Sequence, residues 1–267
     1  MKRISEKFAA LKTQKKSAFI AYICAGHPDY KTSLATLKSM PAAGCDIIEL
    51  GAPFLDPAGD GPTIQKAARA AIEGGMTLKK TLEMVAEFRQ DDSKTPLILM
   101  SYYNPILKFG IDKIFTEAAK SGVDGFLIVD LPPEEEQEIL AEISRNNLDL
   151  IRLIAPTTSQ ERAKKITKNA SGFLYLISML GITGTALAKA EDNIKNLANL
   201  REVSNLPIAI GFGIQNPQQA QEFSKLGVDA VVIGSALVKE MAEKKSSDEI
   251  ILSVTKKLSE FSEALKS

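Results

Sequence analysis

Short apolar runs alternate with segments of helical period along almost the whole chain. Several of the runs are apolar at both odd and even positions, as expected for strands that are buried on both faces. The predicted strands span residues 18–23, 46–51, 97–101, 125–129, 148–153, 172–178, 207–211 and 230–234. Eight strand–helix units in succession predict an α/β fold, a closed (β/α)8 barrel of the TIM barrel type.

Additional helices are predicted at both ends of the chain. A helix before the first strand carries Ile4, Phe8 and Leu11 on one face, so we expect it to close the bottom of the barrel. The last helix carries an apolar stripe, which we interpret as packing against the barrel and not as a partner surface. This stripe consists of Ile250, Val254, Leu258, Phe261 and Leu265.

Two pairs of residues have the spacing of a capping box, in which a hydroxyl and a carboxylate three residues apart satisfy the backbone at a helix start. These pairs are Thr158 with Glu161 and Ser246 with Glu249.

The composition favours one large domain over residues 1–267, because 267 residues with 45% hydrophobic content can bury a single extended core. The 33 basic and 33 acidic residues cancel, so bulk charge indicates neither nucleic acid nor a membrane surface as a partner. The N-terminus lacks a signal-peptide core and no run approaches a spanning helix, which predicts a cytoplasmic protein.

Few residue types remain for metal binding or nucleophilic catalysis. We expect Cys24 and Cys45 to be reduced and buried in or beside strands. The single histidine, His27, is expected in a loop, so no histidine dyad, triad or zinc cluster is predicted. Acid–base chemistry therefore falls to carboxylates, tyrosine or lysine.

A carboxylate interrupts the second predicted strand. Glu49 either faces solvent on an edge strand, joins a structural ion pair, or lies desolvated at a pocket, where its pKa would rise toward values suited to proton transfer. The following loop carries Asp56 and Asp60 among prolines and glycines. Asp60 either works at the same mouth as Glu49 or caps the next helix. Asp56 is expected to be a loop and interface residue.

Three glycine turns follow the last three predicted strands, at residues 181–184, 211–213 and 234–235. Turns at this end of a barrel supply backbone N–H groups to a phosphate, and Ser235 would add a hydroxyl at a helix start. The alternative is that tight turns simply require glycine. Three turns on adjacent strands favour a phosphate monoester as the ligand.

The segment 48–65 reads Ile-Glu-Leu-Gly-Ala-Pro-Phe-Leu-Asp-Pro-Ala-Gly-Asp-Gly-Pro-Thr-Ile-Gln and closely resembles the signature of the tryptophan synthase alpha subunit family. The resemblance extends along the chain through segments 21–26, 101–105, 124–132, 181–184, 211–213 and 233–235. Leu55 and Gly59 depart from the usual serine and alanine, and both lie in the loop beside Asp60.

The resemblance implies retro-aldol cleavage of indole-3-glycerol phosphate to indole and glyceraldehyde 3-phosphate. Glu49 would shuttle protons to indole C3 and from the glycerol hydroxyl, while an ionised Asp60 would stabilise positive charge on the indole nitrogen. Thr183 would hydrogen-bond Asp60 on closure, and Tyr175 would contact Glu49 or the glycerol.

The implied substrate-binding residues lie on strands or in the glycine turns. They are Tyr22, Met100, Tyr102, Leu127, Tyr175, Thr183, Gly184, Phe212, Gly213, Gly234 and Ser235. Without the resemblance, the simplest interpretation of the strand residues would be ordinary barrel core. This applies to Tyr22, Met100, Leu127, Leu153, Phe212 and Val232. Met179 and Leu180, in the expected lid, depart from the family and affect closure more than chemistry.

The same resemblance implies a partner, the tryptophan synthase beta subunit, in an α2β2 heterotetramer that passes indole to a pyridoxal phosphate site. No cofactor is expected in this chain, which offers no lysine motif for it. Apolar residues of segments 53–57, 103–107 and 131–133 would form the partner rim. The alternatives are another phosphate-binding barrel enzyme, or a catalytically weak alpha-like subunit that binds the phosphate ligand and activates the beta subunit.

Overall fold

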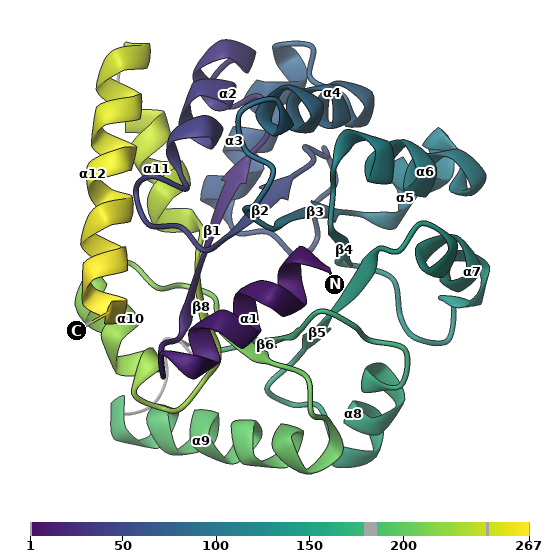
Figure 1. Ribbon diagram of the computed structural model, residues 1–267, viewed down its shortest axis with the longest axis vertical. Helices are drawn as coiled ribbons and strands as arrows, with labels where there is room; N and C mark the ends of the chain where they lie inside the picture. The colour runs from purple at the N-terminus through teal and green to yellow at the C-terminus, as the bar shows by residue number, and fades with distance from the viewer. Residues whose placement is uncertain (1, 179–185, 244–245, 267) are drawn as a thin grey trace.

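The barrel predicted from the sequence is present. The computed structural model describes residues 2–178, 186–243 and 246–266 and contains eight parallel strands that close in sequence order (Figure 1). The strands are β1 (Ala18–Cys24), β2 (Ile47–Gly51), β3 (Leu97–Ser101), β4 (Gly125–Ile128), β5 (Asp149–Ile154), β6 (Leu174–Ile177), β7 (Ile208–Gly211) and β8 (Ala230–Ile233). Every predicted strand is therefore confirmed, with ends that differ by at most two residues.

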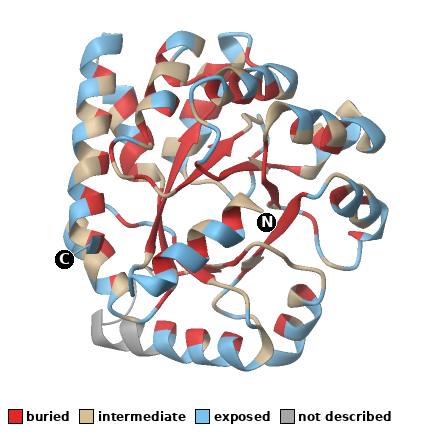
Figure 2. Cartoon of the chain, viewed as in Figure 1, coloured by how far each residue is buried: buried red, intermediate tan, exposed pale blue. Residues whose placement is uncertain are grey.

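Helices surround the barrel, and some connections contain two of them. The helices are α1 (Arg3–Thr13), α2 (Tyr30–Ser39), α3 (Pro62–Glu73), α4 (Leu78–Arg89), α5 (Tyr103–Phe109), α6 (Ile111–Ser121), α7 (Gln137–Arg145), α8 (Gln160–Thr167), α9 (Ala186–Val203), α10 (Pro217–Ser224), α11 (Ser235–Glu243) and α12 (Ser247–Lys266). Their inner faces and the strands are buried while their outer faces are exposed (Figure 2).

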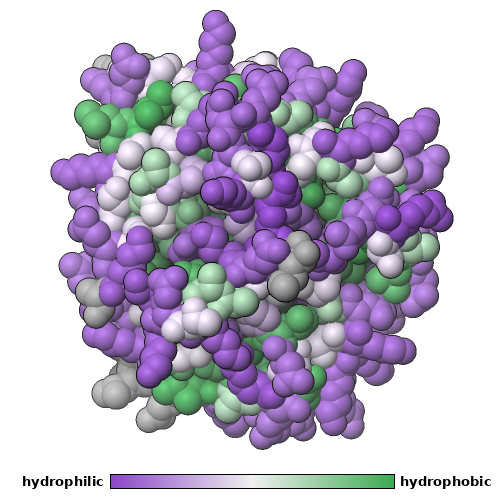
Figure 3. Space-filling view, viewed as in Figure 1, coloured by the Kyte–Doolittle hydropathy of each residue, from purple (hydrophilic) through white to green (hydrophobic). Residues whose placement is uncertain are grey.

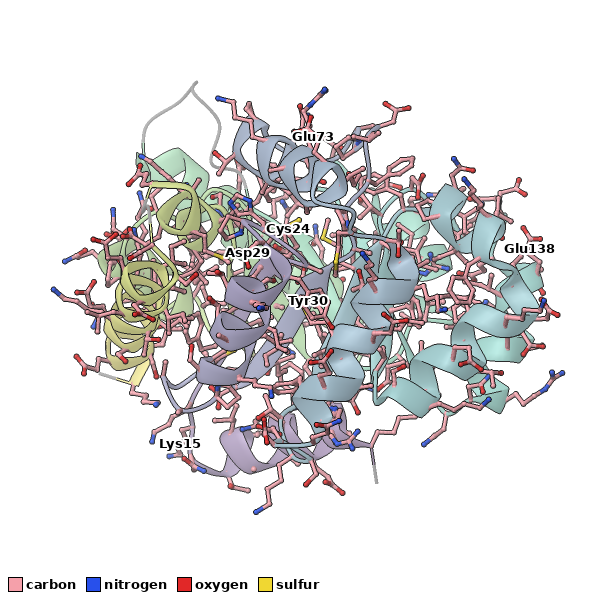
Figure 4. The ribbon with its side chains drawn as sticks, turned by 90° about the horizontal axis from the view of Figure 1, so that it is seen from above. Lys15, Cys24, Asp29, Tyr30, Glu73 and Glu138 are labelled. Carbon is pink, nitrogen blue, oxygen red and sulfur yellow. The ribbon has the colours of Figure 1, made fainter. Side chains whose placement is uncertain are left out.

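Helix α1 closes one end of the barrel, as predicted. It lies across the barrel mouth in Figure 1, and its residues Ile4, Phe8 and Leu11 join the cluster of side chains inside the barrel. The rings of Phe8 and Phe173 lie 5.8 Å apart between centroids. In Figure 4, Lys15 marks this end of the molecule, and Cys24, the last residue of β1, lies nearer the opposite end. Function must therefore use that opposite end, where the strands finish.

The apolar stripe of α12 packs against the rest of the molecule, because all five of its predicted residues are buried. The helix begins with the predicted capping box: the Ser246 N–H donates to Glu249 at 3.2 Å, and the Glu249 N–H donates to the Ser246 hydroxyl at 3.3 Å. The other predicted capping box is wrong. Helix α8 is capped by Ser159, whose hydroxyl accepts from the Arg162 N–H at 3.2 Å, in place of Thr158.

The two cysteines are unpaired and buried, as predicted. His27 lies in the loop after β1, also as predicted, although it is buried and burial lowers its pKa. The described residues contain no group of three or more histidine, cysteine or acidic side chains placed to hold a metal. The face covered by α1 is largely hydrophilic (Figure 3), and no helix among the described residues is long and apolar enough to cross a membrane.

Candidate active site

Glu49 lies in the middle of the closed barrel wall. On β2 it is level with Tyr22 of β1 and Ile98 of β3, so the edge-strand interpretation is wrong. The residue is 4% exposed, and one of its carboxyl oxygens, Oε2, is buried without a hydrogen-bond partner. No ion pair to Glu49 occurs among the described residues, which removes the structural ion-pair alternative. What remains is a desolvated acid.

The surroundings of Glu49 favour its protonated form. Burial, and to a smaller extent the negative charge of Asp60, raise the pKa of Glu49 from 4.5 to about 8. At neutral pH this carboxyl group therefore carries a proton that it can donate.

Asp60 lies beside Glu49 on the loop that follows β2. The Tyr102 hydroxyl accepts a hydrogen bond of 3.0 Å from the Gly59 N–H and donates to the Asp60 carboxylate. Burial raises the pKa of Asp60 to about 6, and the Tyr102 hydrogen bond opposes that rise, so Asp60 is mostly ionised at neutral pH. Helix α3 has Gly61 as its N-cap and no side-chain cap, which makes the capping interpretation of Asp60 wrong.

A cavity of about 660 Å³ opens at this end of the barrel. Ten of the predicted site residues line it: Tyr22, Glu49, Asp60, Met100, Leu127, Tyr175, Phe212, Gly213, Gly234 and Ser235. Leu153 and Val232, equally compatible with barrel core, line it as well. Tyr102 is not among the described lining residues and instead holds the Asp60 loop. Thr183 and Gly184 lie outside the described residues, as do Met179, Leu180 and the first glycine turn.

Two tyrosines lie near Glu49, the buried Tyr22 and the half-buried Tyr175, and glycines at the strand ends make room for them. A Cβ on Gly51 would lie 2.3 Å from the Tyr22 hydroxyl, and a Cβ on Gly211 would lie 2.5 Å from the Tyr175 hydroxyl. Burial raises the pKa of both tyrosines, and the negative charge of Glu49 adds to the shift. The effect of the Glu49 charge on Tyr175 is consistent with the prediction that these two side chains lie close together.

The glycine turns after β7 and β8 line the same cavity. Gly213 has a φ of 77°, a conformation that favours glycine. Helix α11 begins at Ser235, and the Leu237 N–H of its first turn donates to the Gly234 carbonyl at 2.9 Å. The preceding N–H groups, of Ser235 and Ala236, have no intrahelical acceptor and point to an anion site. The Ser235 hydroxyl accepts a hydrogen bond of 3.1 Å from the Gln215 amide, another lining residue. The arrangement suits a phosphate group.

Several lining residues were not predicted. Val129 and Ala155 directly follow β4 and β5, so the rule that functional residues follow strand ends would have found them. Thr158, Arg162 and Ile166 line the cavity from α8 and the turn before it. No motif or spacing marks this last group as part of a binding site, because only the position of α8 relative to the barrel brings it to the cavity.

The predicted partner rim is partly exposed. Leu55 and Leu107 are 58% and 46% exposed, and Pro132 is also exposed. Ile106 and Leu131, expected on the same rim, are buried. These two residues are buried because helical and loop geometry turns some apolar side chains of these segments toward the core.

Comparison with known proteins agrees with this geometry. A family model described as "Tryptophan synthase alpha chain" matches residues 8–266. A curated tryptophan synthase alpha chain from Granulibacter bethesdensis is 48% identical over 271 residues, covering 100% of this chain and 97% of the relative.

Solved structures give the same result. A tryptophan synthase subunit alpha from Legionella pneumophila superposes with a TM-score of 0.89 at 34% identity, over 99% of this chain and 98% of that one. A chain of M. tuberculosis tryptophan synthase in its aminoacrylate-bound form gives 0.88 at 30% identity, over 99% and 100%. The chain therefore belongs to the tryptophan synthase alpha chain family.

Proposed function

We propose that Glu49 and Asp60 carry out the retro-aldol cleavage of indole-3-glycerol phosphate, the lyase reaction of the family. The observation that carries the assignment is the difference in pKa between two neighbouring carboxyl groups in one cavity. Glu49, with a pKa of about 8, holds a proton at neutral pH, whereas Asp60, with a pKa of about 6, is mostly ionised. Unequal pKa values of this kind separate the acid from the electrostatic stabiliser.

Glu49 alone can carry out both proton transfers of the cleavage. The Glu49 carboxyl group donates its proton to indole C3, and the adjacent glycerol hydroxyl then returns a proton to the Glu49 carboxylate. The bond between C3 and the glycerol carbon breaks, its electron pair returns to the indole ring, and the hydroxyl carbon becomes the aldehyde. Glu49 ends the cycle protonated, as it began.

Asp60 stabilises the intermediate of this sequence. Protonation at C3 places positive charge on the indole nitrogen, and an ionised carboxylate in a desolvated site stabilises that charge. The Tyr102 hydroxyl, which also accepts from the Gly59 N–H, fixes the orientation of Asp60. The apolar walls supplied by Met100, Leu127 and Tyr22 suit the indole ring.

The phosphate would lie at the turns containing Gly213, Gly234 and Ser235. Backbone N–H groups there bind an anion without a lysine or arginine at the turns themselves. The closed barrel and the terminal helices packed on it support our proposal of one domain over residues 1–267.

The partner of the subunit is the tryptophan synthase beta chain, in the α2β2 assembly of the family, and pyridoxal phosphate belongs to that beta chain. The exposed Leu55 and Leu107 give this chain an apolar surface beside the cavity mouth for such a partner. We place the complex in the cytoplasm, where the amino-acid biosynthesis that it serves takes place.

Product analysis tests the lyase assignment. The purified chain is incubated with indole-3-glycerol phosphate, and the products are separated by chromatography. Equal amounts of indole and glyceraldehyde 3-phosphate are expected. An isomerised or ring-closed product in their place would assign the chain to another class of barrel enzyme.

A further inference from the structure

The active-site cavity contains an arginine for which the reaction as described has no use. Arg162 is the one lysine, arginine or histidine among the described residues that line the cavity. The two other titratable side chains with carboxyl groups there are Glu49, which is protonated at neutral pH, and Asp60, which is mostly ionised, and the substrate adds a phosphate dianion. A cation in this position lowers the electrostatic cost of bringing that dianion in.

Helix stability does not explain an arginine at this position. Arg162 lies in the first turn of α8, where the positive end of the helix dipole disfavours a cation. Glu161 of the same turn already supplies the acid that such an end favours, and Ser159 supplies the cap. A residue that opposes the local preference beside a cavity is a candidate for a functional role.

Glu134 holds the guanidinium group. Arg162 donates to both carboxylate oxygens of Glu134, with one of the two contacts at 2.9 Å. Hydrogen bonding between them raises the pKa of Arg162 and lowers that of Glu134, so both are charged at neutral pH. The side chains are 38% and 52% exposed, and an ion pair in water is weak enough to exchange partners.

We infer that Arg162 is a specificity residue for the phosphorylated substrate, and that Glu134 competes with the phosphate group for its charge. The inference rests on the proposed function. Arg162 attracts the dianionic end of the ligand and favours it over an unphosphorylated analogue, while Glu134 orients the arginine and limits how strongly it attracts the anion. The glycine turns bind the phosphate, and Arg162 adds positive charge from α8, at another part of the lining of the same cavity.

The test compares Arg162→Met with a matched control. Arg145→Met removes an equally charged side chain that is 70% exposed and pairs with Glu142 at 2.7 Å, away from the cavity. Calorimetry with glycerol 3-phosphate measures the charged part of the ligand, and indole serves as the uncharged probe. Thermal denaturation checks that each variant is folded.

We expect Arg162→Met to weaken glycerol 3-phosphate binding roughly two- to fivefold at low salt, with little change for indole. The KM for the substrate should rise by a similar factor at constant kcat. Glu134→Gln should tighten glycerol 3-phosphate binding, and both effects should fade as salt is added.

Unchanged glycerol 3-phosphate affinity in Arg162→Met, or an equal loss in Arg145→Met, would overturn the inference. A lower kcat at constant KM would also contradict it, because it would assign Arg162 to the chemical step. Failure of the proposed lyase activity is seen separately, as absence of indole from the unmodified chain, and leaves the binding measurement valid.

Discussion

Proton transfer in this site depends on the environment of a single strand residue. Glu49 has a raised pKa because the barrel wall buries it and because Asp60 lies nearby. Asp60 stays largely ionised because the loop is more open and Tyr102 donates a hydrogen bond to it. Two carboxyl groups of similar intrinsic acidity thereby acquire different roles.

Replacing either carboxylate by its amide separates its role in catalysis from any role in binding the substrate. Glu49→Gln keeps the shape of the side chain but cannot transfer the proton, so kcat should fall about a hundredfold or more. Asp60→Asn should cost on the order of a hundredfold through lost charge stabilisation. Single-turnover indole release measures both. Affinity for glycerol 3-phosphate, the control, should hardly change, and near-normal turnover of Glu49→Gln would refute its assigned role.

The raised pKa of Glu49 also predicts how stability depends on pH. Between its ordinary value of 4.5 and the folded value of about 8, the folded state holds a proton that the unfolded state releases, so this group's stabilising contribution is lost as pH rises. Glu49→Gln removes that loss. The variant should gain stability relative to wild type from pH 5 to pH 8, by on the order of a few kcal/mol.

Urea denaturation at several pH values measures this difference. A stability gap between Glu49→Gln and wild type that stays constant from pH 5 to pH 8 would mean that Glu49 is not desolvated in the folded protein.

At the scale of elements, neighbouring residues of similar chemistry limit what sequence reasoning can find. Thr158 and Ser159 both precede α8 and both carry a hydroxyl. The spacing to Glu161 indicated Thr158, whereas the backbone places Ser159 at the cap. At α12 two hydroxyls, Ser246 and Ser247, are again adjacent, but there the spacing to Glu249 indicated the residue that the backbone does place at the cap, so the prediction was right.

The cap of α8 gives an element-scale prediction. Ser159→Ala should lower the free energy of unfolding by about 1 kcal/mol, because the Arg162 N–H loses its acceptor. Thr158→Ala, the matched control, should have a smaller effect. Chemical denaturation of both variants decides between them, and the reverse order would restore the capping box predicted from the sequence.

The strands were predicted more reliably than the cavity, for a physical reason. Buried strands need apolar side chains at both parities, which leaves a signal in the sequence, and Glu49 was conspicuous because it interrupts such a run. Arg162 leaves no such signal, because the packing of α8 against the barrel decides what it faces. The space that Gly51 and Gly211 leave for tyrosine hydroxyls is likewise visible only once the strands are paired.

At the scale of the whole molecule, the partner surface that we propose and the cavity lie at the same end of the barrel. Leu107 of α5 lies on the predicted rim and is 46% exposed. Leu252 of α12 is 73% exposed but lies outside the rim, so it serves as the matched control. Leu107→Asp should weaken binding of the beta chain about tenfold or more, whereas Leu252→Asp should not. Titration calorimetry measures both. Equal affinities of the two variants would place the interface elsewhere.

The roles proposed for Glu49 and for the beta chain are tested most directly by the rate of indole release from indole-3-glycerol phosphate, measured with and without the tryptophan synthase beta chain. We expect slow release by the chain alone, faster release on adding the beta chain, and almost none from Glu49→Gln in either condition. A folded chain that binds the beta chain but releases no indole in either condition would contradict this expectation, and would leave a phosphate-binding activator of the beta chain as the better description.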